Sequence, residues 1–118
     1  MIFRHNVEDR YSDMAVYNGV AYLAGQIANN TTQNIVGQTR EVLGMIDALL
    51  QTAGTDKSRI LMAQIHLSNM LDYDGMNEAW DEWVKDIKGH APPRATVQSP
   101  LAGSEFLVEI IVTAATGA

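Results

Sequence analysis

Residues 89–97 read Gly-His-Ala-Pro-Pro-Arg-Ala-Thr-Val and separate a helical pattern from an extended one. Proline fixes its own φ at about −65° and drives the preceding residue toward extended conformations, so Ala91–Pro93 cannot be helical. The sequence before this stretch predicts a helix that ends at Gly89, and the sequence after it predicts a strand that begins at Arg94. Arg94 therefore follows a rigid segment, and we expect its guanidinium to have a fixed direction.

Arg94 and Glu109 are the two candidate functional residues that stand out. A fixed guanidinium presents a planar set of donors that matches a carboxylate in a bidentate pair. Glu109 is the lone carboxylate in the apolar run Leu107–Val112, where an acidic side chain needs a partner. We expect Arg94 to be that partner. A structural or surface arginine, and a glutamate at a strand edge, are the alternatives.

Length and charge limit the class of protein. The chain has 118 residues, which predicts a single domain covering 1–118, in the size range where burial is often gained by oligomerisation. Its net charge is −6 and it has only 8 Lys and Arg residues, so it has no basic stripe for phosphates. This balance argues against nucleic acid or an anionic membrane as the main partner and favours a small molecule.

The residue inventory also excludes several kinds of chemistry. There is no cysteine, so no disulfide, thiol nucleophile or cysteine-based metal site is expected. The three histidines are scattered, and no phosphate loop or Ser-His-Asp arrangement is present, so we expect neither a metal nor a cofactor. No basic leader or membrane-length apolar run is visible, which predicts a cytoplasmic protein.

Hydrophobic periodicity gives the order of the elements. Asn18-Gly19 predicts a tight hairpin turn, Gly54 a helix C-terminus, and Asp72 the N-cap of a second helix. The strands are expected at 2–7, 13–16, 20–23, 58–67, from residue 94 onward and at 106–114, and the helices at 33–53 and 72–88.

The resulting order β-β-β-α-β-α-β-β predicts an α+β domain, with a mixed sheet and two helices packed on one of its faces. The stripe of Tyr73, Met76, Trp80 and Trp83 in the second helix predicts a core-facing side. Alternating apolar residues in 58–67 and 106–114 would leave the other sheet face apolar, which predicts self-assembly.

Several short motifs follow one another in the order and spacing of a known family. They are Tyr11-Ser12, Ala24-Gly25-Gln26-Ile27, Gln38-Thr39, Met76-Asn77-Glu78-Ala79-Trp80, Pro93-Arg94-Ala95-Thr96-Val97 and Val108-Glu109-Ile110. Over nearly its whole length the chain resembles the RidA/YjgF family of reactive-intermediate deaminases. The Asn77–Val84 block and the Gly89–Pro92 approach resemble its YoaB-like branch.

The resemblance implies a chorismate-mutase-like fold, a homotrimer and clefts between neighbouring subunits. It implies hydrolysis of enamine and imine intermediates such as 2-aminoacrylate to 2-keto acids and ammonia, without a cofactor. Carried over by position, Arg94 would bind the substrate carboxylate and Glu109 would orient water. Tyr11 and Gly25 would line the cleft.

The chain departs from the family pattern at three positions. Thr96 stands where a cysteine is frequent, which removes a thiol but keeps a hydrogen-bonding side chain. Arg10 replaces the usual proline before Tyr11. Asp13 replaces the usual glutamine, and it would disfavour bulky acidic substrates if it faces the cleft.

Three rival functions are considered. Chorismate mutase would need several cations in its cleft, and the other arginines lie outside the matched motifs. A ribonuclease fits poorly with the acidic balance. A non-enzymatic sensor or chaperone-like trimer that binds small carboxylates could use the same Arg94, and turnover of 2-aminoacrylate would distinguish it from a deaminase.

Overall fold

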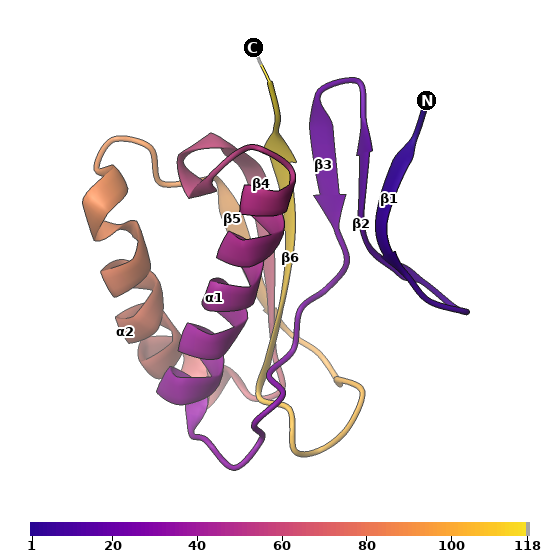
Figure 1. The fold of residues 1–118 in the computed structure, drawn as a ribbon. Helices are drawn as coiled ribbons and strands as arrows, with labels where there is room; N and C mark the ends of the chain where they lie inside the picture. The colour runs from indigo at the N-terminus through magenta and orange to yellow at the C-terminus, as the bar shows by residue number, and fades with distance from the viewer. Residues whose placement is uncertain (118) are drawn as a thin grey trace.

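The computed structural model describes residues 1–117 and contains a six-stranded mixed sheet with two α-helices on one face (Figure 1). The predicted order of strands and helices is confirmed. The strands are β1 (Phe3–Val7), β2 (Ser12–Tyr17), β3 (Val20–Leu23), β4 (Ile60–Leu67), β5 (Arg94–Gln98) and β6 (Val108–Ala115), and the helices are α1 (Ile35–Thr52) and α2 (Tyr73–Val84).

The sheet order is β1-β2-β3-β6-β4-β5, so the last strand is inserted between the hairpin and β4. All neighbours are antiparallel except β4 and β5, which α2 connects as a parallel pair. The predicted hairpin between β2 and β3 is confirmed. Asn18 and Gly19 have φ values of 51° and 76°, the left-handed values that a tight two-residue turn requires.

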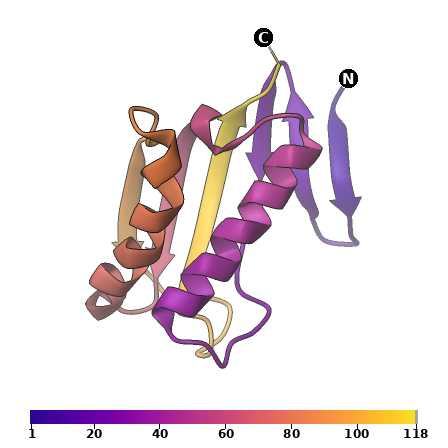
Figure 2. The same ribbon diagram turned by 60° about the vertical axis from the view of Figure 1, so that its left-hand side comes forward.

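Both helices cover the same face of the sheet (Figure 2), which confirms the predicted layers. The side chains buried between the two helices and the sheet include Val42, Ile46 and Leu50 of α1, Met76 and Trp80 of α2, and Ile65, Val108, Ile110 and Val112 of the sheet. The helices are also tied to each other, because the Trp83 indole N–H lies 3.0 Å from an oxygen of Asp47. Within residues 1–117, no helix covers the opposite face, which we call the open face.

The sheet's β6 strand is held in place by a buried glutamine of α1. Gln38 is fully buried, and its amide nitrogen donates to the carbonyl oxygen of Glu105 at 3.1 Å. Its amide oxygen accepts from the backbone N–H of Leu107 at 3.0 Å. The pair of hydrogen bonds fixes the segment that leads directly into Glu109.

One local prediction was wrong. The apolar alternation predicted for 58–67 puts Leu61 on the same face as Ala63 and Ile65, but Leu61 is half-exposed. The register shifts between Ile60 and Met62, and Ile60 enters the core instead. Asp72 is the N-cap of α2, as predicted, although its side chain makes no capping hydrogen bond. The chain enters α2 through a 3-10 turn at Met70–Asp72, where the Asn69 side chain accepts from the N–H of Leu71.

Both helices are shorter than predicted, since α1 spans Ile35–Thr52 and α2 ends at Val84, where a 3-10 turn at Lys85–Ile87 follows it. α1 begins after Asn34, whose side chain accepts a hydrogen bond from the N–H of Gly37 at 3.0 Å. Gly54 follows the end of α1 with a φ of 76°, as expected for a C-terminal glycine. Within residues 1–117, no helix combines the length and the apolar character that crossing a bilayer requires.

Candidate active site

A hollow of about 650 Å³ opens where β3 ends and the chain turns toward α1. Its lining residues come from β2 and the residue before it, from the segment after β3, from α1 and from β6: Tyr11, Asp13, Ala24, Gly25, Gln26, Ile27, Asn29, Met45 and Glu109. Four residues predicted from the sequence as site residues, Tyr11, Asp13, Gly25 and Glu109, therefore line one hollow. We refer to it as the Glu109 hollow.

Gly25 provides the space that the Glu109 carboxyl group occupies. A Cβ atom on Gly25 would lie 2.8 Å from Cδ of Glu109 and 3.1 Å from its Cγ, well inside van der Waals contact. The backbone of the next residue, Gln26, bridges Ile110, with N–H to O distances of 2.9 and 3.1 Å. This bridge holds the glycine backbone against the side chain of Glu109.

Replacing Gly25 with alanine should move the Glu109 carboxylate without unfolding the protein, because the atom in the way is the far end of a flexible side chain. We expect a melting temperature close to that of the wild type and activity reduced more than about tenfold. The control is Gly44→Ala on α1, where a new Cβ meets nothing within 4 Å. This control should retain activity and gain about 0.5–1 kcal/mol in stability. A fully active Gly25→Ala variant would show that the Glu109 position is not critical.

Asp13 is oriented toward the open face by its neighbours. It precedes Met14, which is buried on the helix-covered face, and alternation along β2 places Asp13 on the opposite side. The Asn6 amide donates to the Asp13 carboxylate at 2.9 Å. The Asp13 carbonyl accepts from the N–H of Ala24 at 2.8 Å, so Asp13 lies beside the chain that leads to Gly25.

Arg94 lies against α2 and is held there by polar and aromatic contacts. Its Nη2 donates to the Asn77 Oδ1 at 2.6 Å and lies 3.4 Å from the Tyr73 hydroxyl. The guanidinium carbon lies 5.0 Å from the centroid of Trp80 and 6.0 Å from that of Tyr73. The expectation of a guanidinium with a fixed direction agrees with these contacts.

The predicted ion pair between Arg94 and Glu109 does not form within the chain. Arg94 is paired in the sheet with the fully buried Ala63, so its side chain points to the helix-covered face. Glu109 lies between Val108 and Ile110, which are fully buried against the helices, so its side chain points to the open face. The prediction was wrong because strand alternation places the two residues on opposite sides of the sheet, with β4 between their strands.

Thr96 lies on the same face as Arg94 and is not among the residues that line the Glu109 hollow. If Thr96 contributes packing or one neutral hydrogen bond, Thr96→Val should cost about 1 kcal/mol in transition-state stabilisation. Steady-state kinetics should then show a rate loss of about tenfold or less. A loss of several thousandfold would instead place the hydroxyl in the proton transfer.

The sequence of the whole domain decides the family. The model of the family described as endoribonuclease L-PSP matches residues 2–116. The chain belongs to this family. The resemblance to YjgF proteins that the motifs around Tyr11, Arg94 and Glu109 carry is confirmed.

Curated and solved members of the endoribonuclease L-PSP family match the chain end to end. A RutC family protein of Haemophilus ducreyi is 50% identical over 115 residues, covering 98% of this chain and 97% of the relative. The RutC family protein YoaB of Escherichia coli is 41% identical over 114 residues, covering 97% of each chain. The crystal structure of a YjgF family member from Neisseria meningitidis has a TM-score of 0.95 and 38% identity, covering 100% of this chain and 97% of that one.

The prediction from sequence missed three residues of the candidate site in this family member. Asn77 fixes the guanidinium of Arg94, and Tyr73 was assigned to the core although it is 40% exposed and contacts Arg94. Their spacing offered a signal: Tyr73, Asn77 and Trp80 recur at helical intervals and share one side of α2. Gln26 is the third residue missed. It is only 7% exposed and lines the Glu109 hollow.

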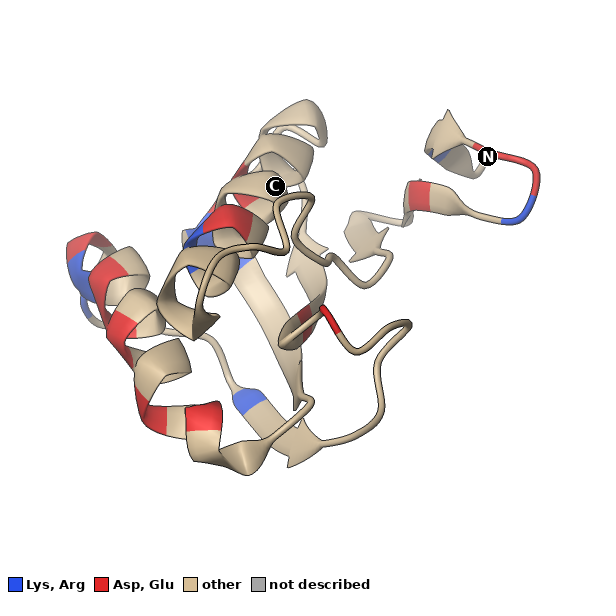
Figure 3. Cartoon of the chain, turned by 90° about the horizontal axis from the view of Figure 1, so that it is seen from below, with Lys and Arg blue, Asp and Glu red and all other residues tan. Residues whose placement is uncertain are grey.

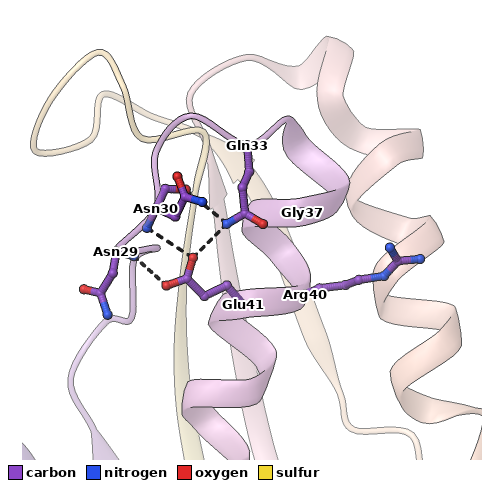
Figure 4. Close-up of a pocket in the computed structure, with 6 residues that line it drawn as sticks. All are labelled: Asn29, Asn30, Gln33, Gly37, Arg40 and Glu41. Atoms are coloured by element: carbon purple, nitrogen blue, oxygen red, sulfur yellow. Dashed lines mark hydrogen bonds between the residues drawn. The ribbon is translucent and has the colours of Figure 1, made fainter.

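A second hollow, at the start of α1, has a structural role. Figure 4 shows Glu41 beneath the loop, where it accepts hydrogen bonds from the N–H groups of Asn29 and Asn30 and from the Gln33 amide at 2.8–3.2 Å. Arg40 points away from Glu41 in this view. Because Asn29 also lines the Glu109 hollow, Glu41 stabilises one wall of the candidate site.

Proposed function

We propose that this protein hydrolyses reactive 2-imino and 2-enamino acids, of the 2-aminoacrylate type, to 2-keto acids and ammonia. The observation that carries the proposal is that a single chain holds the two key groups apart on opposite faces of the sheet. Arg94 is fixed for carboxylate binding on one face, and Glu109 is placed beside a hollow on the other. A complete site then needs Arg94 from one copy and Glu109 from a second.

The charges of Arg94 and Glu109 fit a site that is shared between two copies of the chain. Arg94 is half-buried and makes no salt bridge within residues 1–117, so its remaining N–H groups are available to a carboxylate. Glu109 likewise makes no salt bridge in this part of the chain. Two unpaired, opposite charges that cannot meet within one chain are complementary between two copies.

The chemistry requires little beyond these two groups. A protonated imine carbon is electrophilic, so the site must hold the substrate carboxylate, orient one water and accept its proton. Arg94 performs the first task and Glu109 the other two. Water adds to the imine carbon as Glu109 takes a proton. That proton returns to the nitrogen, and the new hydroxyl group passes its own proton to Glu109 as the C–N bond breaks. A 2-keto acid and ammonia leave, and the ammonia takes up the proton from Glu109.

The open face of the sheet supports the assembly that this site needs. Its exposed residues include Tyr22 and Val97, which are 52% and 46% exposed. A hollow of about 260 Å³ lies on β4 and β5 and is lined by Met62, Gln64, Ile65, His66, Ala95 and Val97. We propose that two further copies cover this face in a homotrimer with three clefts between subunits.

Mixed trimers test the site between subunits directly. Arg94→Ala and Glu109→Gln should each be inactive alone, and co-assembly of the two variants should restore activity. In random assembly at equal amounts, about one site in four combines an intact Arg94 with an intact Glu109. The assay couples a serine dehydratase, which supplies 2-aminoacrylate, to detection of the keto acid.

Each other outcome counts against a specific part of the proposal. Activity that stays absent in a mixture shown to contain trimers of both variants would contradict a site shared between two subunits. Light scattering that gives a monomer at micromolar concentration would exclude the trimer and the clefts together. Wild-type protein that binds carboxylates without accelerating keto-acid release would favour the carboxylate sensor.

The acidic surface opposes the nuclease activity that the family description names. α2 carries four acidic residues and no Lys or Arg, and Figure 3 shows them along its length. RNA binding without a basic surface would require overcoming phosphate repulsion over much of the molecule. We therefore expect no RNA cleavage by protein that hydrolyses 2-aminoacrylate.

A further inference from the structure

We infer that the hydroxyl group of Tyr73 is a further substrate-binding group, which donates a hydrogen bond to the substrate carboxylate beside Arg94. This inference rests on the proposed function and adds a residue to the half of the site that binds the carboxylate. Tyr73 is the first residue of α2 and directly follows the 3-10 turn at Met70–Asp72. The argument comes from the hydrogen bonds of the Arg94 guanidinium.

The Nη2 atom of Arg94 has two hydrogen-bond partners at very different distances. Asn77 Oδ1 lies 2.6 Å away, a short distance typical of a charge-assisted hydrogen bond. The Tyr73 hydroxyl lies 3.4 Å away, which is long for such a bond. Among residues 1–117, the partner of Nη1 is the thioether sulfur of Met76 at 3.7 Å. The contact with Tyr73 is therefore one that a ligand can replace.

A carboxylate that binds Arg94 in a bidentate pair must take an N–H group from Nη2. In a guanidinium, the two edges that carry a pair of parallel N–H groups are Nε with Nη2 and Nη1 with Nη2. Because Asn77 holds one N–H of Nη2 at short distance, the carboxylate takes the N–H that the Tyr73 hydroxyl holds loosely. One carboxylate oxygen then lies close to the hydroxyl oxygen, since both are near the same nitrogen.

The proton of the Tyr73 hydroxyl is available to that carboxylate oxygen. A phenol hydroxyl both accepts and donates, whereas a carboxylate only accepts. Within residues 1–117 the Tyr73 hydroxyl accepts from Arg94 and donates to no other group, and Tyr73 is 40% exposed. Hydrogen bonds at catalytic sites commonly shorten when the substrate binds. The hydroxyl therefore changes from an acceptor for Arg94 to a donor for the substrate.

Tyr73→Phe tests the inference, because it removes the hydroxyl and keeps the aromatic ring beside Arg94. We expect the dissociation constant of pyruvate, the 2-keto acid formed from 2-aminoacrylate, to rise about tenfold, equivalent to about 1.4 kcal/mol. KM for 2-aminoacrylate should rise by a similar factor and kcat should change much less, because the carboxylate is bound equally in the ground state and the transition state. Calorimetry measures the first quantity and steady-state kinetics the others.

Tyr17→Phe is the matched control, since it makes the same change on a 47% exposed tyrosine at the end of β2, outside both halves of the proposed site. It should bind pyruvate as the wild type does, and melting curves must show that both variants fold. Infrared spectroscopy separates a direct hydrogen bond from an effect on the position of Arg94. The carboxylate bands of bound, isotope-labelled pyruvate should shift when the Tyr73 hydroxyl is removed.

Equal or tighter pyruvate binding by Tyr73→Phe would overturn the inference, because a hydroxyl that only competes for Nη2 would improve binding when it is removed. Unchanged carboxylate bands, an equal loss of affinity in Tyr17→Phe, or a wild type that binds no pyruvate would overturn it as well. If the wild type binds pyruvate but does not accelerate keto-acid release, the proposed function fails. Pyruvate binding still decides the inference in that case, since weaker binding by Tyr73→Phe supports it.

Discussion

Arg94→Lys should lose nearly as much activity as Arg94→Ala, although it keeps the positive charge. The wild-type guanidinium donates to Asn77 and lies 5.0 Å from the centroid of Trp80. A guanidinium fixed in this way can form two parallel hydrogen bonds to a carboxylate. A lysine ammonium is a point charge on a flexible chain, so it reproduces neither the fork nor the stacking. Steady-state kinetics with 2-aminoacrylate should show most of the loss in kcat/KM.

The control for Arg94→Lys is Arg40→Lys on α1, which makes the same change on an exposed side chain outside both halves of the proposed site. It should keep wild-type kinetics. A melting curve and light scattering must show that Arg94→Lys still folds and assembles. If folded Arg94→Lys retains near-wild-type kcat/KM, charge alone is sufficient and the bidentate contact is not needed.

Glu109→Gln should lower kcat by about 10²–10⁴-fold while leaving the fold intact. Glutamine has nearly the same shape and still fits beside Gly25, but it cannot accept a proton from the attacking water. KM should change much less, because Arg94 binds the substrate carboxylate. Kinetics of folded, assembled protein make this distinction.

Glu105→Gln supplies the matched control, since it makes the same change on an exposed side chain in the loop before β6. It should remain fully active. Retention of most activity by Glu109→Gln would instead make Glu109 a structural residue. If Arg94→Lys were also close to wild type, the sensor that binds small carboxylates would become the better interpretation.

The amino-acid sequence alone determined the elements and their order. Hydrophobic periods, the Asn18-Gly19 turn, Gly54 and the double proline before Arg94 act over a few residues, so local chain geometry was enough to predict them. The family resemblance also pointed to Tyr11, Asp13, Gly25 and Glu109, which the structure places around one hollow. The predictions of the elements succeeded because each depended on short-range patterns.

Only the tertiary structure decided which of these residues share a site. The order of strands placed β4 between β5 and β6, and a strand's period of two sent Arg94 and Glu109 to opposite faces. The contacts of Arg94 with Asn77 and of Gly25 with Glu109 join segments far apart in the chain. Pairing between distant strands is set by how the whole core packs, which no local pattern encodes.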